Sequence, residues 1–215
     1  MSGLLLAGMG LPGSGKSAVF TALAGLLSRG GIEAKSYCEP EESEWGQAVK
    51  RRDESGYFTA MTWFRAQRVP NVYQAAADRA AGKIALVDSF YDKLIHLYFD
   101  RPGFEWLMKA DDPYRSAYRT IAALDFSTLP DADCVVTLTV SEDRWTQLVH
   151  GRGRQLDQSS RLLETHHTQR AFLDACGTYC QKQGIPHVEF ENRHETALGA
   201  AEALRDELQA ARVLR

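Results

Sequence analysis

The octapeptide GLPGSGKS, from Gly10 to Ser17, fits the pattern G-x-x-x-x-G-K-[ST]. Glycines in this pattern let a loop turn its backbone N–H groups inward around a phosphate group. The lysine then reaches the outer phosphates, and the hydroxyl group that follows it can ligate Mg²⁺. We therefore expect a phosphate-binding loop whose contact residues are Gly10, Gly13, Ser14, Gly15, Lys16 and Ser17.

The segments on either side of this loop have the character that such a loop requires. Residues 4–7 (LLLA) form a short apolar run, which predicts a buried strand directly before the loop. Residues 17–28 (SAVFTALAGLLS) have the periodicity of an amphipathic helix, which Gly30 and Gly31 end. The N-terminus of that helix adds a partial positive charge at the phosphate site.

Apolar and amphipathic segments alternate along the rest of the chain. Further strands are expected at residues 33–38, 84–87, 134–140 and 187–191. Helices are expected at residues 57–81 (one helix, or two broken at Pro70), 90–99, 114–125, 142–150, 159–183 and 195–211. This alternation predicts an α/β protein with the P-loop NTPase fold, in which about five parallel strands carry helices on both faces.

The composition limits the class of protein. The chain has 215 residues, of which 44% are hydrophobic, and this suits one domain spanning residues 1–215. A net charge of −3 predicts no nucleic-acid polymer as partner, and no apolar stretch is long enough to span a membrane. The apolar N-terminus has no basic region, so we do not expect a signal peptide. Four cysteines without a C-x-x-C pair indicate reduced thiols and a cytoplasmic protein.

A glycine-flanked basic segment follows the fourth expected strand. Arg152 and Arg154 lie in it, and Arg144 lies a little upstream. Small kinases need a lid at this place, whose arginines close over the transferring phosphate and neutralise its charge. We expect such a lid at about residues 150–160, with Arg144 contributing to nucleotide binding. The alternative is an ordinary solvated basic turn.

Two carboxylates follow expected strands next to the phosphate loop. Glu39 comes after residues 33–38, at the carboxyl end where ligands bind in open α/β sheets. There it could orient and deprotonate an attacking hydroxyl group, or it could be a surface glutamate before a turn. Asp88 ends the strand at residues 84–87 and could support Mg²⁺ together with Ser17, or cap the next helix.

Five segments form a recognisable series along the chain: residues 36–40 (SYCEP) with Trp45, 57–67, 83–93, 149–173 and 190–192. In this order they resemble the deoxynucleoside kinases and the related thymidylate kinases, which are P-loop small-molecule kinases. The resemblance implies ATP and Mg²⁺ as cofactors and Glu39 as the general base. It also implies Lys16, Arg152 and Arg154 as phosphate-contacting catalytic residues and Asn192 beside the adenine. The expected acceptor-site residues are Trp45, Tyr57, Phe58, Arg65 and Gln67.

The sequence departs from the family pattern near Asp88. The family has an arginine after this acidic residue, whereas Ser89 follows it here, and Lys93 or Arg101 are the candidates to compensate. Monophosphate kinases hold the acceptor phosphate with arginines, and one such position holds Cys38 here. We therefore expect ATP-dependent phosphoryl transfer to a hydroxyl group of a neutral, nucleoside-like acceptor.

Three alternatives to this function stay open at the level of sequence. The first is a nucleoside monophosphate kinase of the thymidylate type. The second is an antibiotic or secondary-metabolite phosphotransferase, and the third is a nucleotide-binding switch without an acceptor. The resemblance also implies that the protein could form a homodimer.

Overall fold

A five-stranded parallel sheet forms the centre of the protein. The computed structural model describes residues 3–50, 54, 56–101, 104, 108–152 and 166–214. Within these ranges the strands follow the order β2-β3-β1-β4-β5, and every neighbouring pair is parallel. Their bounds are β1 Leu4–Gly10, β2 Ala34–Tyr37, β3 Ile84–Val87, β4 Cys134–Thr139 and β5 His187–Glu191. The predicted α/β fold class and the five predicted strands are thus confirmed.

The central strand β1 is apolar because both of its faces are buried. Its alternate residues serve two different cores: Leu5 and Met9 face one, and Leu6 faces the other. Gly8 leaves room for the ring of Phe20, since a Cβ atom at Gly8 would lie 2.9 Å from that ring. This close approach holds the first helix against the strand that leads into the phosphate loop.

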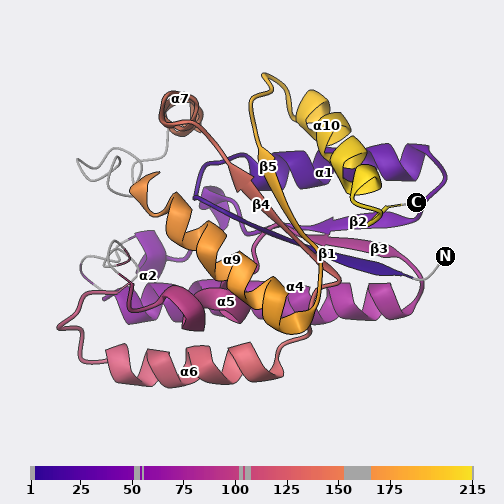
Figure 1. Ribbon diagram of the computed structural model, residues 1–215. Coiled ribbons are helices and arrows are strands. Elements are labelled where there is room, and N and C mark those ends of the chain that lie inside the picture. The colour runs from indigo at the N-terminus through magenta and orange to yellow at the C-terminus, as the bar shows by residue number, and fades with distance from the viewer. Residues whose placement is uncertain are drawn as a thin grey trace.

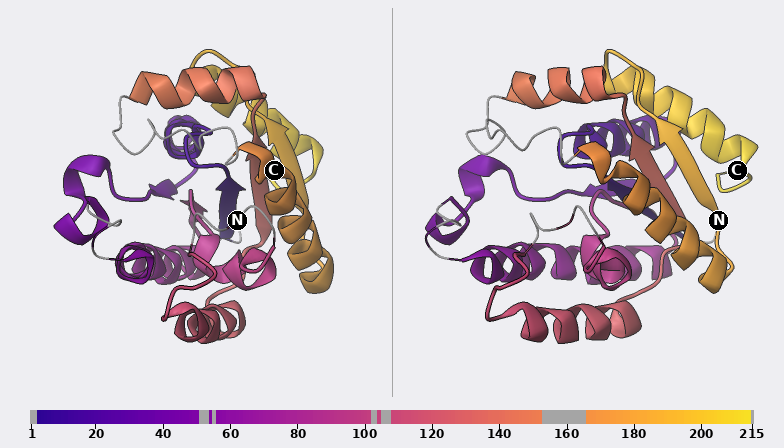
Figure 2. Two further views of the ribbon diagram at one scale, coloured as in Figure 1. Left: turned by 90° about the vertical axis from the view of Figure 1, so that its left-hand side faces the viewer. Right: turned by 60° about the vertical axis from the view of Figure 1, so that its left-hand side comes forward.

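Helices cover both faces of the sheet (Figure 1). On one face α1 (Lys16–Arg29) and α10 (Ala197–Ala210) pack side by side. The other face carries α4 (Tyr57–Ala80), α5 (Tyr91–Tyr98) and α9 (Gln169–Gln183), and α6 (Arg115–Thr128) packs on α5 as an outer layer (Figure 2). Shorter elements are the 3-10 helix η1 (Glu42–Glu44), α2 (Gln47–Lys50) and α7 (Glu142–Arg152).

Helix α4 passes through Pro70 without a break, so the two-helix alternative for this segment is wrong. Pro70 cannot donate a hydrogen bond to the carbonyl of Ala66. Both residues are exposed, and water can therefore satisfy that carbonyl. On the opposite side, Val72 and Ala75 are buried and hold the helix on the sheet.

Two predicted boundaries after β4 need correction. Helix α7 continues to Arg152 instead of ending near residue 150, so Gly151 and Arg152 are helical and the expected loop does not begin there. A glycine such as Gly151 destabilises a helix by only about 1 kcal/mol. The burial of Trp145 and Val149 can stabilise α7 by more than that. The long helix predicted at 159–183 is interrupted at Thr168, and α9 begins at Gln169. Residues 153–165 lie outside the described part.

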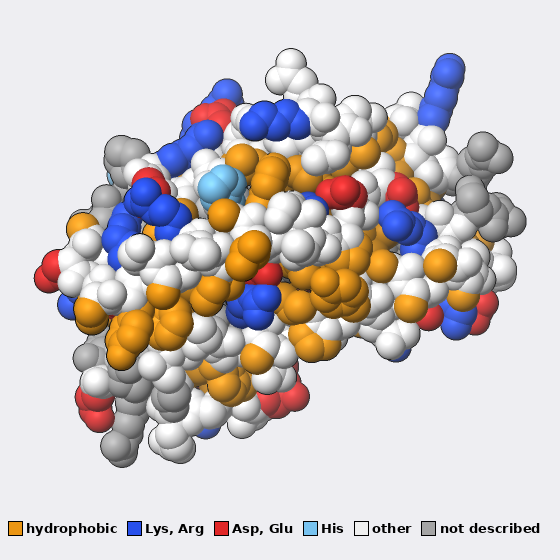
Figure 3. All heavy atoms as spheres, turned by 90° about the horizontal axis from the view of Figure 1, so that it is seen from below, with side chains coloured by type: hydrophobic (Ala, Val, Ile, Leu, Met, Phe, Trp, Pro, Cys, Tyr) orange, Lys and Arg blue, Asp and Glu red, His pale blue; other side chains and the backbone are white. Residues whose placement is uncertain are grey.

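The face seen from below carries hydrophobic side chains among charged ones (Figure 3). Exposed large apolar residues include Tyr114 and Leu124 of the α6 region and Tyr73 of α4. Exposed apolar residues alone do not establish that two copies of the chain associate, so the homodimer stays a prediction.

All four cysteines are free thiols. Within the described residues, we find no helix with the length and hydropathy needed to cross a membrane.

Candidate active site

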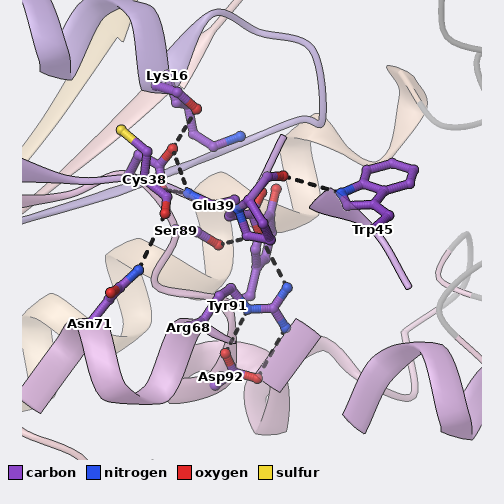
Figure 4. Close-up of polar contacts among 12 residues, drawn as sticks. Lys16, Cys38, Glu39, Trp45, Arg68, Asn71, Ser89, Tyr91 and Asp92 are labelled. Atoms are coloured by element: carbon purple, nitrogen blue, oxygen red, sulfur yellow. Dashed lines mark hydrogen bonds and ion pairs between the residues drawn. The ribbon is translucent and has the colours of Figure 1, made fainter. Parts of the chain in front are cut away.

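The carboxyl ends of three neighbouring strands bring the predicted site residues together. The phosphate loop follows β1, Asp88 follows β3, and Cys38 and Glu39 follow β2. Because parallel strands end at the same edge of the sheet, segments up to 78 residues apart meet there. Figure 4 shows Glu39 between this loop and helices α4 and α5.

The phosphate loop has the backbone conformation that its glycines permit. Gly15, the N-cap of α1, has φ 89° and ψ 9°, which lies in the left-handed region. A Cβ atom at Gly15 would also lie 2.9 Å from Nδ2 of Asn192. The N–H groups of the first turn of α1 have no carbonyl partner within the helix, so they are donors for an anion. These features fit a bound triphosphate.

Lys16 is buried and folds back over the loop. Its Nζ donates hydrogen bonds to the carbonyls of Gly10 at 3.1 Å and Leu11 at 2.9 Å. The hydroxyl of Tyr91 donates to the same Gly10 carbonyl, and Nζ of Lys16 lies 5.6 Å from the centre of the Tyr91 ring. The ammonium group is therefore held at the loop, where it is expected to contact the phosphates.

Ser17 and Asp88, the two residues predicted to ligate Mg²⁺, are in contact with each other. The Ser17 hydroxyl donates to Oδ2 of Asp88, and the backbone N–H of Glu39 donates to Oδ1 at 3.1 Å. Burial, followed by the nearby Glu39 carboxylate, raises the pKa of Asp88 to about 6. A hydroxyl and a carboxylate suit Mg²⁺, which usually takes one or two protein ligands beside water and phosphate. In the described ranges no cluster of three His, Cys, Asp or Glu residues could hold a metal ion.

The Glu39 carboxylate is held through one of its two oxygens. Oε1 accepts hydrogen bonds from Nη1 of Arg68 at 3.1 Å and from the hydroxyl of Ser89 at 2.9 Å. Within the described residues, no side chain or backbone group donates to Oε2. The side chain is 29% exposed. One oxygen is thus fixed, while the other can accept a proton from a bound molecule.

Arg68 is the residue of this site that sequence reasoning missed. The residue is 6% exposed, and its guanidinium forms a bidentate ion pair with Asp92, through Nε at 2.7 Å and Nη2 at 3.1 Å. The signal was nevertheless present in the sequence. Arg68 stands four residues before Val72 and seven before Ala75, on the buried stripe of an amphipathic helix. A charge on such a stripe must find partners, because an unpaired buried charge is costly.

The two candidates to replace the missing arginine after Asp88 lie elsewhere. The ammonium group of Lys93 donates to the carbonyl of Leu129 at 2.6 Å and pairs with Asp131 at 2.9 Å. Arg101 donates from Nε to the carbonyl of Leu97 at 3.1 Å. None of these contacts involves Glu39, whereas the guanidinium of Arg68 contacts the Glu39 carboxylate directly.

A cavity of about 760 Å³ opens beside Ser17 and Glu39. It lies between α1 and α4, next to the segment that follows β2, and its lining is mostly polar or small. Of the five predicted acceptor residues, Gln67 alone is among the described residues that line it. Carboxylates and amides contribute to the lining through Glu39, Glu41, Glu44, Gln67 and Asn71.

The other four predicted acceptor residues are not among the described residues that line the cavity. Trp45 donates from Nε1 to the carbonyl of Pro40 at 3.1 Å. Phe58 stacks on Tyr114 with ring centres 4.8 Å apart, and the Tyr57 ring faces the ammonium group of Lys109 at 5.8 Å. Arg65 forms a bidentate pair with Asp125, with both distances 2.6 Å. Their roles toward an acceptor stay predictions.

The residues expected at the nucleotide stabilise the loops around the phosphate site. Nδ2 of Asn192 donates to the carbonyl of Ser14 at 3.0 Å, and Asn192 is 5% exposed. Nη2 of Arg144 donates to the carbonyl of His194 at 2.7 Å, which fastens α7 to the loop after β5. Arg152 ends α7, and its side chain lies outside the description. Arg154 also lies outside the described residues.

The parallel sheet and the glycine-rich loop after β1 together have the P-loop NTPase fold. Among solved structures, the chain is similar to thymidylate kinase from Candida albicans, with a TM-score of 0.59 and 16% sequence identity. The match covers 98% of this chain and 93% of that chain. No protein-family model matches the sequence, and no curated protein matches it either. At this level of identity the likeness shows the fold.

Proposed function

We propose that this protein is a phosphotransferase that moves the γ-phosphoryl group of ATP to a hydroxyl group of a nucleoside-like small molecule. The observation that carries the proposal is the Glu39 carboxylate beside the phosphate loop. Its Oε1 is bound by Arg68 and Ser89, whereas Oε2 accepts no hydrogen bond from the described residues. A protein that only bound and released nucleotide would not need a carboxylate oriented in this way.

The transfer requires one proton acceptor and several positive charges. Oε2 of Glu39 takes the proton of the acceptor hydroxyl, while the oxygen of that hydroxyl forms a bond to the γ-phosphorus of ATP. The bond from that phosphorus to the bridging oxygen breaks, and ADP leaves with the bonding electrons. Lys16 and the loop N–H groups hold the phosphates, and Arg152 and Arg154 are proposed to neutralise their charge. When bound near Ser17 and Asp88, Mg²⁺ supplies further positive charge to the phosphate oxygens.

The charge around Glu39 supports a neutral acceptor. Arg68 is the cation in contact with this carboxylate, and it is already paired with both Asp92 and Glu39. Asp88 adds a further carboxylate, which contacts the backbone of Glu39. An acceptor phosphate would have to approach these negative charges, since the described residues lining the cavity include no lysine or arginine. A nucleoside hydroxyl meets no such repulsion.

A nucleoside monophosphate kinase is the second candidate function. The observation that favours it is the fold shared with a thymidylate kinase over nearly the whole chain. In that case the acceptor hydroxyl would belong to a phosphate group, and an arginine would be needed to hold it. The two candidates therefore differ in the charge of the acceptor.

A panel assay for ADP release from Mg²⁺-ATP tests the proposal. The acceptors are the natural nucleosides, their monophosphates, and several sugar and antibiotic alcohols. Lys16→Ala is the blank, because the variant loses the ammonium group at the phosphates. We expect turnover with at least one nucleoside and none with the variant. Turnover with monophosphates alone would establish the second candidate, whereas persistent ATP binding without turnover on any acceptor would favour a switch.

A further inference from the structure

We infer that Arg68 is a positioning residue that fixes the Glu39 carboxylate in front of the phosphate loop. This inference rests on the proposed function, because it takes Glu39 as the base that accepts the proton of the acceptor hydroxyl. It gives a role to a buried cation that belongs to neither the phosphate loop nor the expected lid. Figure 4 shows its guanidinium between Asp92 and Glu39.

The guanidinium of Arg68 is itself rigidly held. Two of its nitrogens are engaged by the two oxygens of Asp92, at 2.7 and 3.1 Å, so the plane of the group is fixed. Aromatic rings pack near it, with ring centres 5.6 Å away for Phe64 and 5.7 Å away for Tyr91. The remaining nitrogen, Nη1, then points to Oε1 of Glu39 at 3.1 Å. A fixed donor of this kind can set the orientation of the carboxylate that it contacts.

Helix α5 links this arrangement to the phosphate loop. Asp92, which holds Arg68, follows Tyr91, whose hydroxyl donates to the carbonyl of Gly10 at the start of the loop. The two residues lie in the first turn of the same helix, and both are buried. One turn of α5 therefore fixes Glu39, through Arg68, and the phosphate loop, through Tyr91. The distance between the base and the phosphates follows from this shared attachment.

Ser89 alone would leave the carboxylate less constrained. A single hydroxyl donor at 2.9 Å still allows the Glu39 side chain to rotate about its bonds, and that side chain is 29% exposed. The charged donor from the other side restricts this rotation. A displacement of about 1 Å in a reacting group can lower a rate about 100-fold, so the contact matters for turnover.

The test uses a variant that can fold without the ion pair. Arg68→Met alone would leave Asp92 buried and unpaired, so the variant is Arg68→Met combined with Asp92→Asn. With the best acceptor of the panel, we expect this double variant to lose about 100-fold in kcat, while the KM for ATP stays within about twofold. Arg68→Lys keeps a cation and should recover part of the lost kcat. Arg79→Met, on the same helix but paired with Asp133, should change kcat less than about twofold.

A double-mutant cycle separates positioning from a general loss of structure. In a Glu39→Gln background, the Arg68→Met/Asp92→Asn change should lower kcat less than about threefold, because there is no base left to position. If the two losses multiply instead, Arg68 does not act through Glu39 and the inference is wrong.

A crystal structure of the Arg68→Met/Asp92→Asn variant gives a readout that needs no acceptor. We expect the Glu39 carboxylate to leave its wild-type position or to occupy several rotamers, with the phosphate loop unchanged. An unmoved carboxylate would overturn the inference. If no compound of the panel is phosphorylated but the carboxylate moves, the proposed function fails and the positioning by Arg68 stands.

Discussion

The phosphate loop and the proposed acceptor segment (residues 38–45) lie next to each other at one end of the sheet, but they are held in place differently. The loop at residues 10–17 takes its conformation from its own glycines and from the strand and helix that it joins, and Tyr91 and Asn192 each donate a hydrogen bond to it. The segment at residues 38–45 depends on side chains from α4, such as Arg68 and Asn71, which lie about 30 residues further along the chain. A local motif thus sets the backbone conformation of the phosphate loop, whereas the Glu39 carboxylate takes its orientation from distant side chains. Changes to the two regions should separate in kinetics.

The largest expected effect comes from Glu39, the carboxylate of the proposed acceptor segment. Glu39→Gln keeps the size of the side chain but removes the proton acceptor, so kcat should fall about 100- to 10,000-fold. The affinity for ATP should change little, because the loop does not depend on this side chain. Steady-state kinetics and calorimetric titration with Mg²⁺-ATP measure the two quantities.

Either of two results would break this separation. An unchanged kcat in Glu39→Gln would remove the residue from the role of base. A large loss of ATP affinity in the same variant would mean that the acceptor side shapes the phosphate loop after all. Glu202→Gln is a suitable control, because it changes an exposed carboxylate on α10, which packs on the other face of the sheet.

The next effect concerns stability and pH at Asp88, which contacts both regions. Its pKa is raised from 3.8 to about 6 by burial and by Glu39. The folded state therefore binds the Asp88 proton more tightly than the unfolded state. The stabilisation that comes from protonated Asp88 is complete below about pH 4 and is lost as the pH rises through about 6. Without metal, the ionised Asp88 should cost about 1–3 kcal/mol at pH 8.

Asp88→Asn removes this cost because it cannot ionise. The free energy of unfolding of the variant, relative to the wild type, should therefore rise between pH 5 and pH 8 in denaturant titrations without Mg²⁺. Asp111→Asn, at an exposed aspartate, should show no such rise. An equal difference at both pH values would mean that Asp88 is not desolvated in the free protein.

The smallest effects come from two asparagines, each of which fastens one region by a single hydrogen bond. Asn192 donates to the carbonyl of Ser14 in the loop at 3.0 Å, and Asn71 donates to the carbonyl of Cys38 in the acceptor segment at 3.2 Å. A hydrogen bond of this kind contributes about 1 kcal/mol, or about fivefold in an equilibrium constant. Asn192→Ala should therefore raise the KM for ATP, and Asn71→Ala should raise the KM for the acceptor. The opposite assignment, or both constants rising together in each variant, would show that the regions are coupled.

Sequence reasoning reached the parts of the site that a local pattern encodes. The loop, the five strands and the positions of Glu39 and Asp88 at strand ends all follow from short segments with a clear period or motif. Arg68 was missed because its partners Asp92 and Glu39 come from two other elements, and only the fold brings the three together. The continuity of α4 was also undecided, since the exposure of Pro70 depends on how the helix packs.

The acceptor residues show the limit of the same reasoning. Aromatic side chains at helical spacing can line a pocket or fill a core, and the periodicity is identical in both cases. In the structure Phe58 stacks on Tyr114, and Arg65 pairs with Asp125 of α6. Both partners lie more than 50 residues away in sequence, so no local signal distinguishes these contacts from contacts with a ligand.

The strand order has a consequence for how copies of the protein meet at high concentration. Among the described residues, strands β2 and β5 are the edges of the sheet, and each has one row of backbone groups that no other described strand pairs with. β2 has four residues with the exposed Lys35 among them, and β5 carries exposed Glu189 and Glu191. Short, charged edges oppose the pairing of sheets from separate molecules, which is a common first step in aggregation. Both described edges therefore disfavour growth of the sheet from copy to copy.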